Sequence, residues 1–430
     1  MKQSPRSHIR RLALGRFISV TGGGMAYTAL GYAVWERTND FWLQALALLL
    51  TFGVTGLAGP LAGALGDRYD RRKVMAWSEG LAALAFFAMA TTDQPRWLIG
   101  FAFASALLES PFWSASRASI PSLAESQDQI SWANSLFGMG WSSGIALGPV
   151  IAGILLALTQ PEDASLPADP SLIFALNGVS FLVSLGLTLS VRGQFSDERE
   201  PDETQEHKGL LAGVRYLAKE PVLARMMIAF VVFVLGLGMG MVADAALAES
   251  FQVRGQIPFL WFTIDGSLGF GLLIACWGTG AFAGNWAGRW LNERREVVWL
   301  VFGSAGIAVA SFGVGTAPIF PLVLGSLLVF GVFDGLSIVA ENGLMQRRTP
   351  DVVRSRVFAA FEALLSLGLA AAYGFAPLVL EAVGPRVTYR IAGVGALLAF
   401  VLLLPLLRLL RASVDEGERL GAGQPDPVGT

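Results

Sequence analysis

The stretch Gly63-Ala-Leu-Gly-Asp-Arg-Tyr-Asp-Arg-Arg-Lys73 decides the fold of this chain. It holds four basic and two acidic residues, and it separates two apolar runs at 41–65 and 74–92. Each run is close to the roughly 20 residues that a helix needs to cross a bilayer core. Short loops rich in Lys and Arg face the cytoplasm. The stretch therefore predicts two membrane-spanning helices joined by a tight cytoplasmic loop.

The composition of the whole chain agrees with a membrane protein. Of its 430 residues, 53% are hydrophobic and 15% are charged, whereas soluble proteins carry about 25% charged residues. So few charges cannot cover a globular surface in water. Lipid must therefore be the solvent for much of the chain.

Reading outward in units of bilayer-spanning length predicts twelve helices, and hence an all-α membrane protein. A β-barrel would instead show short alternating segments, which are absent. The predicted spans lie at 11–35, 41–65, 74–92, 96–118, 132–158, 171–191, 224–243, 264–288, 296–315, 319–345, 356–381 and 389–411.

The distribution of basic residues predicts the topology. With both termini in the cytoplasm, 26 of the 31 Lys and Arg residues fall on the inner side and 5 on the outer side. Because basic residues favour the cytoplasmic side, this asymmetry supports twelve helices with both ends inside. We expect a multi-pass protein of a bacterial-type plasma (inner) membrane.

A long polar segment at 192–220 divides the spans into two blocks of six. Its acidic, Pro-containing composition cannot bury a core. Near its end, apolar residues at helical spacing predict an amphipathic helix on the cytoplasmic surface: Leu210, Leu211, Val214, Leu217 and Ala218. The expected units are an N-terminal six-helix bundle at 1–191, a linker at 192–223, a C-terminal six-helix bundle at 224–411 and a disordered tail at 412–430.

The two blocks carry similar motifs at equivalent positions. Gly63-Ala-Leu-Gly-Asp-Arg68 follows the second span, and Gly284-Asn-Trp-Ala-Gly-Arg289 follows the eighth. A basic pair follows each copy, although the second copy lacks the acid. Two six-helix repeats with a site between them are what a rocking transporter requires.

The charged loop resembles the signature of the major facilitator superfamily between its second and third helices. The resemblance implies that Gly63 permits close helix packing, and that Asp67 bonds to the opposing half in one conformation. The sequence departs at Asp70, where the general pattern has glycine; an Asp there is familiar among exporters of macrolides and siderophores. The alternative is that these charges are only a topology signal. The expected conformational latch comprises Gly63, Asp67, Arg68, Arg71, Arg72, Glu79 and Glu362.

The stretch Gly144-Ile-Ala-Leu-Gly-Pro-Val-Ile-Ala-Gly153 resembles the helix 5 motif of the drug/proton antiporter branches. Gly144 and Gly148 are four residues apart, so they share one helix face and permit close backbone contact. Pro149 removes a hydrogen bond and bends the helix. Ala152 departs from the pattern, which has a glycine there. Ordinary packing of membrane helices is the alternative.

Two further stretches, 121–135 and 346–358, resemble the exporter branch and follow the fourth and tenth spans. The resemblance covers roughly residues 11 to 411. It implies the major facilitator fold, with two six-helix pseudo-repeats, and secondary active efflux by alternating access.

Acids inside apolar spans are candidates for proton coupling, because buried charge is costly and is retained for function. Glu109 and Asp334 fall near the midplane of the fourth and tenth spans. Glu341 lies seven residues after Asp334 on the same helix face, which suggests a proton path. Alternatively, such acids merely tie helices together.

Other charged residues have predicted partners or predicted exposure. Glu79, Glu341 and Glu362 have basic neighbours within reach, and a gating ion pair is the favoured role; these neighbours are Arg72, Arg347 and Arg356. Arg16 is expected to extend to the cytoplasmic surface. Glu36, Asp244, Glu249, Asp265 and Glu381 are expected in water at the external ends.

The substrate cavity is expected to be lined by glycine-weakened helix and by aromatic side chains. Packing against lipid or within the core is the alternative for any single aromatic residue. The candidates are Thr21, Tyr27, Phe112, Trp113, Asn134, Trp141, Phe233, Phe333 and Tyr373.

Several function classes are excluded or disfavoured. No nucleotide-binding P-loop occurs, so energy comes from an ion gradient or from the substrate's own gradient. The apolar spans offer few polar groups, which favours proton-coupled efflux of hydrophobic or amphipathic molecules over a facilitator or importer of a polar metabolite. A membrane enzyme or receptor would need clustered reactive groups, whereas the acids here are isolated.

We expect no catalytic residues, no metal site and no cofactor, with a proton gradient as the energy source. Cys276 is the single cysteine, and both histidines, His8 and His207, lie in polar flanking segments. The expected partners are the lipid bilayer, a small-molecule substrate and protons, with no nucleic acid. The chain is expected to act as a monomer.

Overall fold

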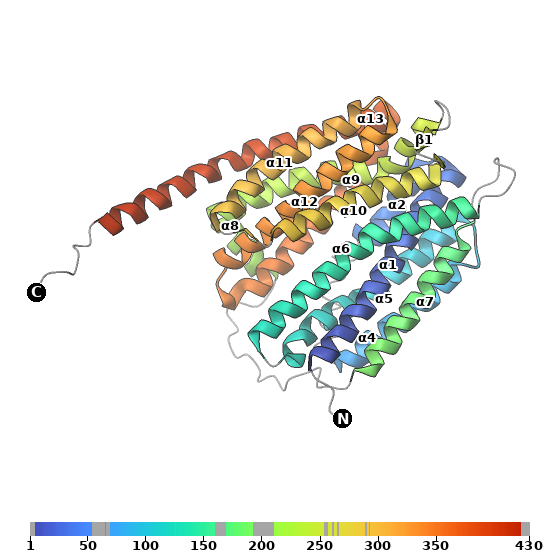
Figure 1. Ribbon diagram of the computed structural model, residues 1–430, viewed down its shortest axis with the longest axis horizontal. Helices are drawn as coiled ribbons and strands as arrows, with labels where there is room; N and C mark the ends of the chain where they lie inside the picture. Colours follow the sequence, from blue (N-terminus) through green and yellow to red (C-terminus); the bar gives the residue numbers. More distant parts are fainter. Residues whose placement is uncertain are drawn as a thin grey trace, which may run out of the picture.

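The computed structural model describes residues 5–53, 65, 69–124, 126–159, 169–191, 210–252, 257–259, 262–264, 266–288, 290–291 and 293–422 (Figure 1). The helices are α1 (Pro5–Thr38), α2 (Phe41–Leu48), the π-helical turn η1 (Leu49–Gly53), α4 (Arg71–Met89), α5 (Pro95–Leu123), α6 (Gln127–Leu158), α7 (Ser171–Ser190), α8 (Leu210–Lys219), α9 (Pro221–Gln252), α10 (Gly266–Gly288), α11 (Glu293–Thr316), α12 (Phe320–Arg348) and α13 (Asp351–Ala422).

Short polar side chains start several of these helices by accepting hydrogen bonds from free backbone N–H groups. Asp40 accepts from the Trp42 amide at 2.7 Å and begins α2. Asp70 accepts from the Lys73 amide at 3.0 Å and begins α4. The aspartate that departs from the general loop pattern therefore caps a membrane helix.

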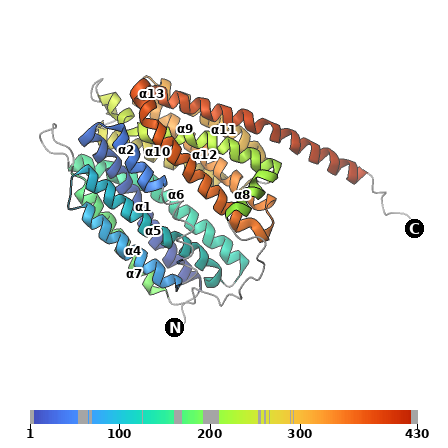
Figure 2. The same cartoon turned by 180° about the vertical axis from the view of Figure 1, so that it is seen from behind.

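Two bundles make up the molecule. We call α1, α2, α4, α5, α6 and α7 the N bundle, and α9 to α13 the C bundle, since the main helix contacts occur within each group. The blue to green N bundle and the yellow to red C bundle lie side by side in Figure 1, where α6 and α10 run along their boundary. A second contact between the bundles joins α2 to α13, near each other in the reverse view of Figure 2.

The two ends of the molecule differ in their connections. A small antiparallel hairpin of β1 (Ile257–Phe259) and β2 (Phe262–Ile264) joins α9 to α10. We call this the hairpin end, and the opposite end, where α1 starts and α8 lies, the linker end. At the linker end, the Tyr216 hydroxyl of α8 donates to the Arg348 carbonyl of α12 at 2.7 Å. Helix α8 thus rests on the C bundle through an apolar face that includes the buried Leu217.

Helix α13 consists of two segments that meet at Gly384. This glycine has a φ of 74°, a left-handed conformation that side chains with a Cβ rarely adopt, and Pro385 follows it. The second segment continues as helix to Ala422 and projects beyond the bundle (Figure 1). The disordered tail expected at 412–430 stays a prediction.

The all-α fold of twelve long helices is confirmed. To reach this count among the described residues, the two segments of α13 are counted as two helices, and α2 with η1 as one. Helix α8 and the β-hairpin are not among the twelve. Seven stretches of the described chain are long and apolar enough to span a membrane, the last of them long enough for both segments of α13: Leu136–Leu156, Ser171–Ser190, Pro221–Phe251, Leu268–Gly288, Arg295–Thr316, Phe320–Arg348 and Ala360–Leu407.

Helices α10 and α12 approach each other closely in the C bundle. Gly280 and Gly284 face Gly331 and Gly335 across this contact, and each of the four has backbone of the other helix where a Cβ would lie. A Cβ on Gly335 would lie 2.8 Å from the Asn285 amide nitrogen. This glycine seam brings the two backbones together, and it places α12 with its acids against α10.

Candidate functional site

A pocket lies where α1 of the N bundle meets the C bundle; we call it the interface pocket. It encloses about 610 Å³ of empty space, including the part open to solvent. Its lining is mostly apolar and aromatic, as small-molecule sites usually are. The lining residues are Tyr27, Gly236, Leu237, Gly240, Met241, Asp244, Leu273, Ile274, Trp277, Leu327, Phe330, Tyr389 and Ala392.

Asp244 is the acid in this lining. It is only 9% exposed and accepts a hydrogen bond from the Tyr389 hydroxyl. It also interacts electrostatically with Tyr27 of the other bundle. The expectation that Asp244 lies in water is therefore wrong. The span was predicted to end at residue 243, whereas α9 continues to Gln252 and holds Asp244 inside the bundle.

The bundles close against each other at the hairpin end. The Trp35 indole of α1 donates to a Glu249 carboxylate oxygen of α9 at 2.6 Å. The Trp42 indole of α2 donates to a Glu381 oxygen of α13 at 3.0 Å. Trp35 also belongs to an apolar core shared by both bundles. Glu249 was expected in water, and instead it is partly buried and joins the bundles. Glu381 is exposed as expected, and it also bonds across the boundary.

The linker end is built differently. There the N bundle has its own apolar core around Ile9 and Met75, and the C bundle has a separate one around Leu223 and Leu344. Further along the boundary, the Asn285 amide of α10 donates to the Ser142 hydroxyl of α6 at 3.3 Å. The shared core of the described residues therefore lies at the hairpin end.

The N bundle holds a buried cluster of charges around Arg16. Arg16 is 4% exposed, its guanidinium lies 3.1 Å from the centre of the Trp113 ring, and it interacts electrostatically with Glu79 and Glu109. It does not reach the surface as expected, because α1, α4, α5 and α7 enclose it. A guanidinium over an aromatic face next to carboxyl groups is a stable arrangement for a buried cation.

Glu79 is held in this cluster by α7. The Ser184 hydroxyl donates to one of its oxygens, and the Thr188 hydroxyl donates to the other at 3.1 Å. These contacts differ from the expected ion pair with Arg72, whose guanidinium donates to the Leu189 carbonyl. Glu79 thus serves the interior of the N bundle.

A second cavity lies inside the C bundle, enclosed by α9, α11, α12 and the second segment of α13; we call it the C-bundle cavity. It holds about 410 Å³ of empty space, including the part open to solvent. Asp334, Ser337 and Glu341 of α12 line it. The Trp277 indole, which lines the interface pocket, donates to an Asp334 oxygen at 3.2 Å. This hydrogen bond links the two spaces.

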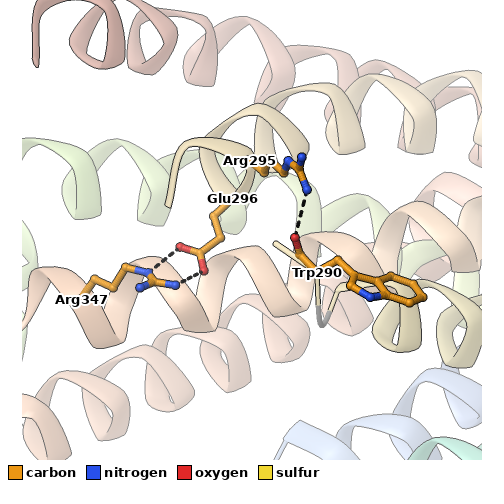
Figure 3. Close-up of polar contacts among 4 residues, drawn as sticks. All are labelled: Trp290, Arg295, Glu296 and Arg347. Atoms are coloured by element: carbon orange, nitrogen blue, oxygen red, sulfur yellow. Dashed lines mark hydrogen bonds and ion pairs between the residues drawn. The ribbon is translucent and has the colours of Figure 1, made fainter. Parts of the chain in front are cut away.

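The expected partner of Glu341 is engaged elsewhere. Arg347 makes two hydrogen bonds of 3.0 Å each to the Glu296 carboxylate of α11 (Figure 3). Glu341 is 6% exposed, and within the described part of the chain its Oε1 has no hydrogen-bond partner. Glu362 interacts electrostatically with Glu341, yet its side chain is exposed. The predicted gating pair between Glu341 and Arg347 is therefore wrong, since α11 supplies a better-placed carboxylate.

Three of the seven predicted latch residues lie outside the described residues, namely Gly63, Asp67 and Arg68. Of the described members, Arg71 is buried at the start of α4 and Arg72 reaches α7. The latch stays a prediction.

The glycines of the helix 5 motif face α1. A Cβ on Gly144 would lie 2.9 Å from the Thr21 amide nitrogen, and one on Gly148 would lie 2.8 Å from the Met25 amide nitrogen. On the other side of α6, Gly153 approaches Gly271 of α10. The motif therefore lies where α6 contacts both bundles.

The predicted cavity residues separate into groups. Tyr27 lines the interface pocket, and Phe233 lines the C-bundle cavity. Phe112 and Trp113 pack on Arg16, and Thr21 packs on α6. The others are elsewhere: Phe333 packs against Gly306 of α11, Tyr373 donates to the Met241 sulfur at 3.5 Å, Trp141 is 36% exposed, and the Asn134 side chain lies outside the described residues.

Sequence reasoning missed Trp277, Tyr389 and Glu296. Trp277 and Tyr389 are aromatic residues in apolar runs, which carry no local signal of a polar contact. Glu296 did carry one, since it is an acid within a predicted span. In the described part of the chain, no group of three or more His, Cys, Asp or Glu residues is placed to hold a metal ion.

Comparison with known proteins agrees with this architecture. The family model of the Major Facilitator Superfamily matches residues 12–253 and again 242–428. Curated relatives include the enterobactin exporter EntS of Shigella flexneri, 24% identical over 415 residues, with 94% of this chain and 92% of the relative covered. EntS of Escherichia coli O1:K1 / APEC is also 24% identical, over 416 residues, with the same coverage.

Solved structures share the fold. A bacterial homologue of the human lysosomal transporter Spinster, inward-facing and unoccupied, has a TM-score of 0.71 at 15% identity, covering 95% of this chain and 98% of its own. A bacterial homologue of the iron transporter ferroportin, inward-facing, has a TM-score of 0.67 at 18% identity, covering 94% and 99%. With two matching family repeats and this twelve-helix architecture, the chain belongs to the Major Facilitator Superfamily and is a multi-pass membrane transporter rather than an enzyme.

Proposed function

We propose that this transporter exports hydrophobic or amphipathic small molecules from the cytoplasm across a bacterial plasma (inner) membrane, by alternating access coupled to proton entry. The observation that carries this proposal is the interface pocket, which lies between the bundles and is lined by aromatic and aliphatic side chains with Asp244 as its acid. Such a lining suits a ligand with large apolar faces and a few polar groups. The relatives named as enterobactin exporters add support for export.

In this proposal the linker end faces the cytoplasm together with both termini. The hairpin end then faces outward, and the Trp35–Glu249 and Trp42–Glu381 contacts close it. Substrate would enter from the linker end, and separation of these contacts would release it outside. One chain suffices, because both bundles and the pocket between them belong to it.

Proton coupling requires an acid that exchanges with both sides. The candidates are Glu109 in the N bundle, and Asp334 and Glu341 in the C bundle. Asp334 is connected to the interface pocket through Trp277, so occupancy of the pocket can influence it. That contact supports coupling between substrate and proton.

The test is substrate-driven proton movement in proteoliposomes that enclose a pH dye. The panel contains catecholate siderophores, macrolides and lipophilic cations. We expect at least one compound to drive proton flux, and Tyr27→Ala to raise its KM about tenfold, equivalent to roughly 1.4 kcal/mol of lost binding. Trp97→Ala is the control, because Trp97 is 53% exposed and lines neither cavity.

A different result would refute the proposal. If no compound drives proton flux, while a polar metabolite is taken up regardless of the pH gradient, the chain is a facilitator. The buried acids would then have structural roles only.

A further inference from the structure

The interiors of the two bundles occupy equivalent positions in the two repeats. Arg16 lies among α1, α4, α5 and α7, which are the first, third, fourth and sixth long helices of the N bundle. The C-bundle cavity lies among α9, α11, α12 and the second segment of α13, which are the first, third, fourth and sixth of the C bundle. In each repeat, therefore, the interior among the first, third, fourth and sixth helices contains polar side chains.

The two places differ in what neutralises their acids. In the N bundle the fixed guanidinium of Arg16 lies beside Glu79 and Glu109. In the C bundle, Asp334 and Glu341 line the cavity, and none of the described lining residues is basic. A buried carboxylate needs a cation or a proton, because its charge is costly away from water.

Glu341 points to a ligand in this cavity. Glu341 is only 6% exposed and lines the cavity, and its Oε1 has no hydrogen-bond partner among the described residues. The Ser337 hydroxyl, one turn before it on α12, also has none. Buried polar groups are nearly always bonded, so these oxygens fit a group that the chain itself does not supply.

Among the described side chains, the surroundings contain no cation that could replace such a ligand. The facing side chains of α9 and α13 are apolar, and α11 contributes the Ser304 hydroxyl. The charged groups that interact with Glu341 are the acids Asp334 and Glu362. Arg347 is held by Glu296 in a bidentate pair.

We propose that the C-bundle cavity is an exchangeable site for one small monovalent cation, a proton or a sodium ion, held by Glu341 with Asp334 and the Ser337 hydroxyl. It is the counterpart of the place that Arg16 fills permanently in the N bundle. Carboxylate and hydroxyl oxygens are the ligands of hard cations. When the cation is a proton, a hydronium ion of the solvent loses one O–H bond and becomes water, and an O–H bond forms on Glu341.

This inference rests on the proposed function and makes it more specific. The C bundle carries the coupling cation, whereas Glu109 is balanced by Arg16 and does not exchange. The Trp277–Asp334 hydrogen bond then connects the cation site to the substrate pocket. A change of charge at Asp334 would be felt by the Trp277 ring that lines the pocket.

The experiment measures cation binding by the full chain in lipid nanodiscs without substrate. One arm measures binding of radioactive sodium at alkaline pH, and the other measures proton uptake after an acid step in weak buffer. If the cation is sodium, we expect saturable sodium binding; if it is a proton, we expect proton uptake alone. In either case, Glu341→Gln should abolish the binding or uptake that the wild-type protein shows. In the sodium arm, Ser337→Ala should lower affinity about tenfold.

Two controls separate this site from general effects. Ser311→Ala should change nothing, because the Ser311 hydroxyl is buried but bonds to the Ile307 carbonyl of its own helix. Asp93→Asn should also leave the signal intact, because Asp93 is an exposed acid between α4 and α5. Unchanged binding in Glu341→Gln, or equal loss in Asp93→Asn, would overturn the inference. Because substrate is absent, failure of substrate-driven flux would refute the proposed function without affecting this result.

Discussion

At the scale of single residues, the buried charges define this protein. Arg16, Glu79 and Glu109 come from three helices and neutralise one another inside the N bundle. In the C bundle, the buried Glu296 of α11 pairs with Arg347 of α12, whose side chain is 48% exposed (Figure 3). Arg16 was expected at the surface and Glu79 in a gate, whereas Glu109 was expected near the midplane as a proton-coupling acid. Burial makes each of them dependent on its partner, since an unpaired charge is costly in a low-dielectric interior.

Replacing Arg16 with methionine should destabilise the protein by about 3 kcal/mol, because Glu79 and Glu109 then lose their buried cation. The measurement is chemical unfolding in mild detergent. The double variant Arg16→Met/Glu109→Gln should recover much of the loss. Arg10→Met is the control on the same helix, since Arg10 is exposed at the linker end and should cost under about 1 kcal/mol. A double variant as unstable as the single one would contradict the electrostatic role.

At the scale of elements, glycines determine which helices meet. Lipid provides little hydrophobic drive for helix association, so close packing and small residues take its place. The seam between α10 and α12 uses glycines four residues apart on both helices. The α6 glycines approach α1 in the same way. Helix α6 thereby packs on its own bundle while it also contacts α10 of the other bundle.

Gly335→Ala should destabilise the protein by about 1–3 kcal/mol, because its methyl group would collide with the backbone of α10. Gly325→Ala on the same helix is the matched control. A Cβ there meets nothing within 4 Å, so the change should be neutral or slightly stabilising through helix propensity. Thermal unfolding in detergent measures both. Equal effects at the two positions would show that helix propensity, and not the seam, is responsible.

At the scale of the whole molecule, the bundles meet asymmetrically. They share an apolar core and two indole–carboxylate hydrogen bonds at the hairpin end, and they keep separate cores at the linker end. A transporter that alternates must break one set of contacts to open the other side. The hairpin-end contacts are therefore the ones that hold this conformation.

Trp35→Phe should shift the population toward a state open at the hairpin end. The lost bond to the Glu249 carboxylate is worth about 1.5 kcal/mol, or roughly a tenfold change in the equilibrium. Spin labels at Asp93 and Ile319, in a Cys276→Ser background, report the separation of the bundles at that end. A longer-distance population should appear in Trp35→Phe.

The control for this shift is Trp97→Phe. Trp97 lies exposed on the N bundle and stacks on Phe101 of its own helix, so its loss should leave the distances unchanged. If the two variants give the same distribution, the Trp35–Glu249 bond does not hold the bundles together.

The sequence by itself determined the properties that depend on local composition. Apolar runs of bilayer length predicted twelve helices, and the resemblance of the charged loop identified the family. Apolar spacing at 210–218 predicted α8 within a residue, since amphipathicity is a property of one segment. Even there, helix ends shifted: α9 extends nine residues past its predicted end and buries Asp244.

Only the tertiary structure decided the partners of the polar groups inside. Glu79 accepts a hydrogen bond from α7, which is more than 100 residues away in the sequence. Arg347 forms a hydrogen bond with Glu296, although Glu341 is nearer to it in the sequence. Trp277 connects two cavities that no linear pattern marks. The physical reason is that a buried charge takes the partner that helix rotation and close packing bring to its depth. Helix rotation and close packing depend on how all the helices pack together, and not on the sequence of any single helix.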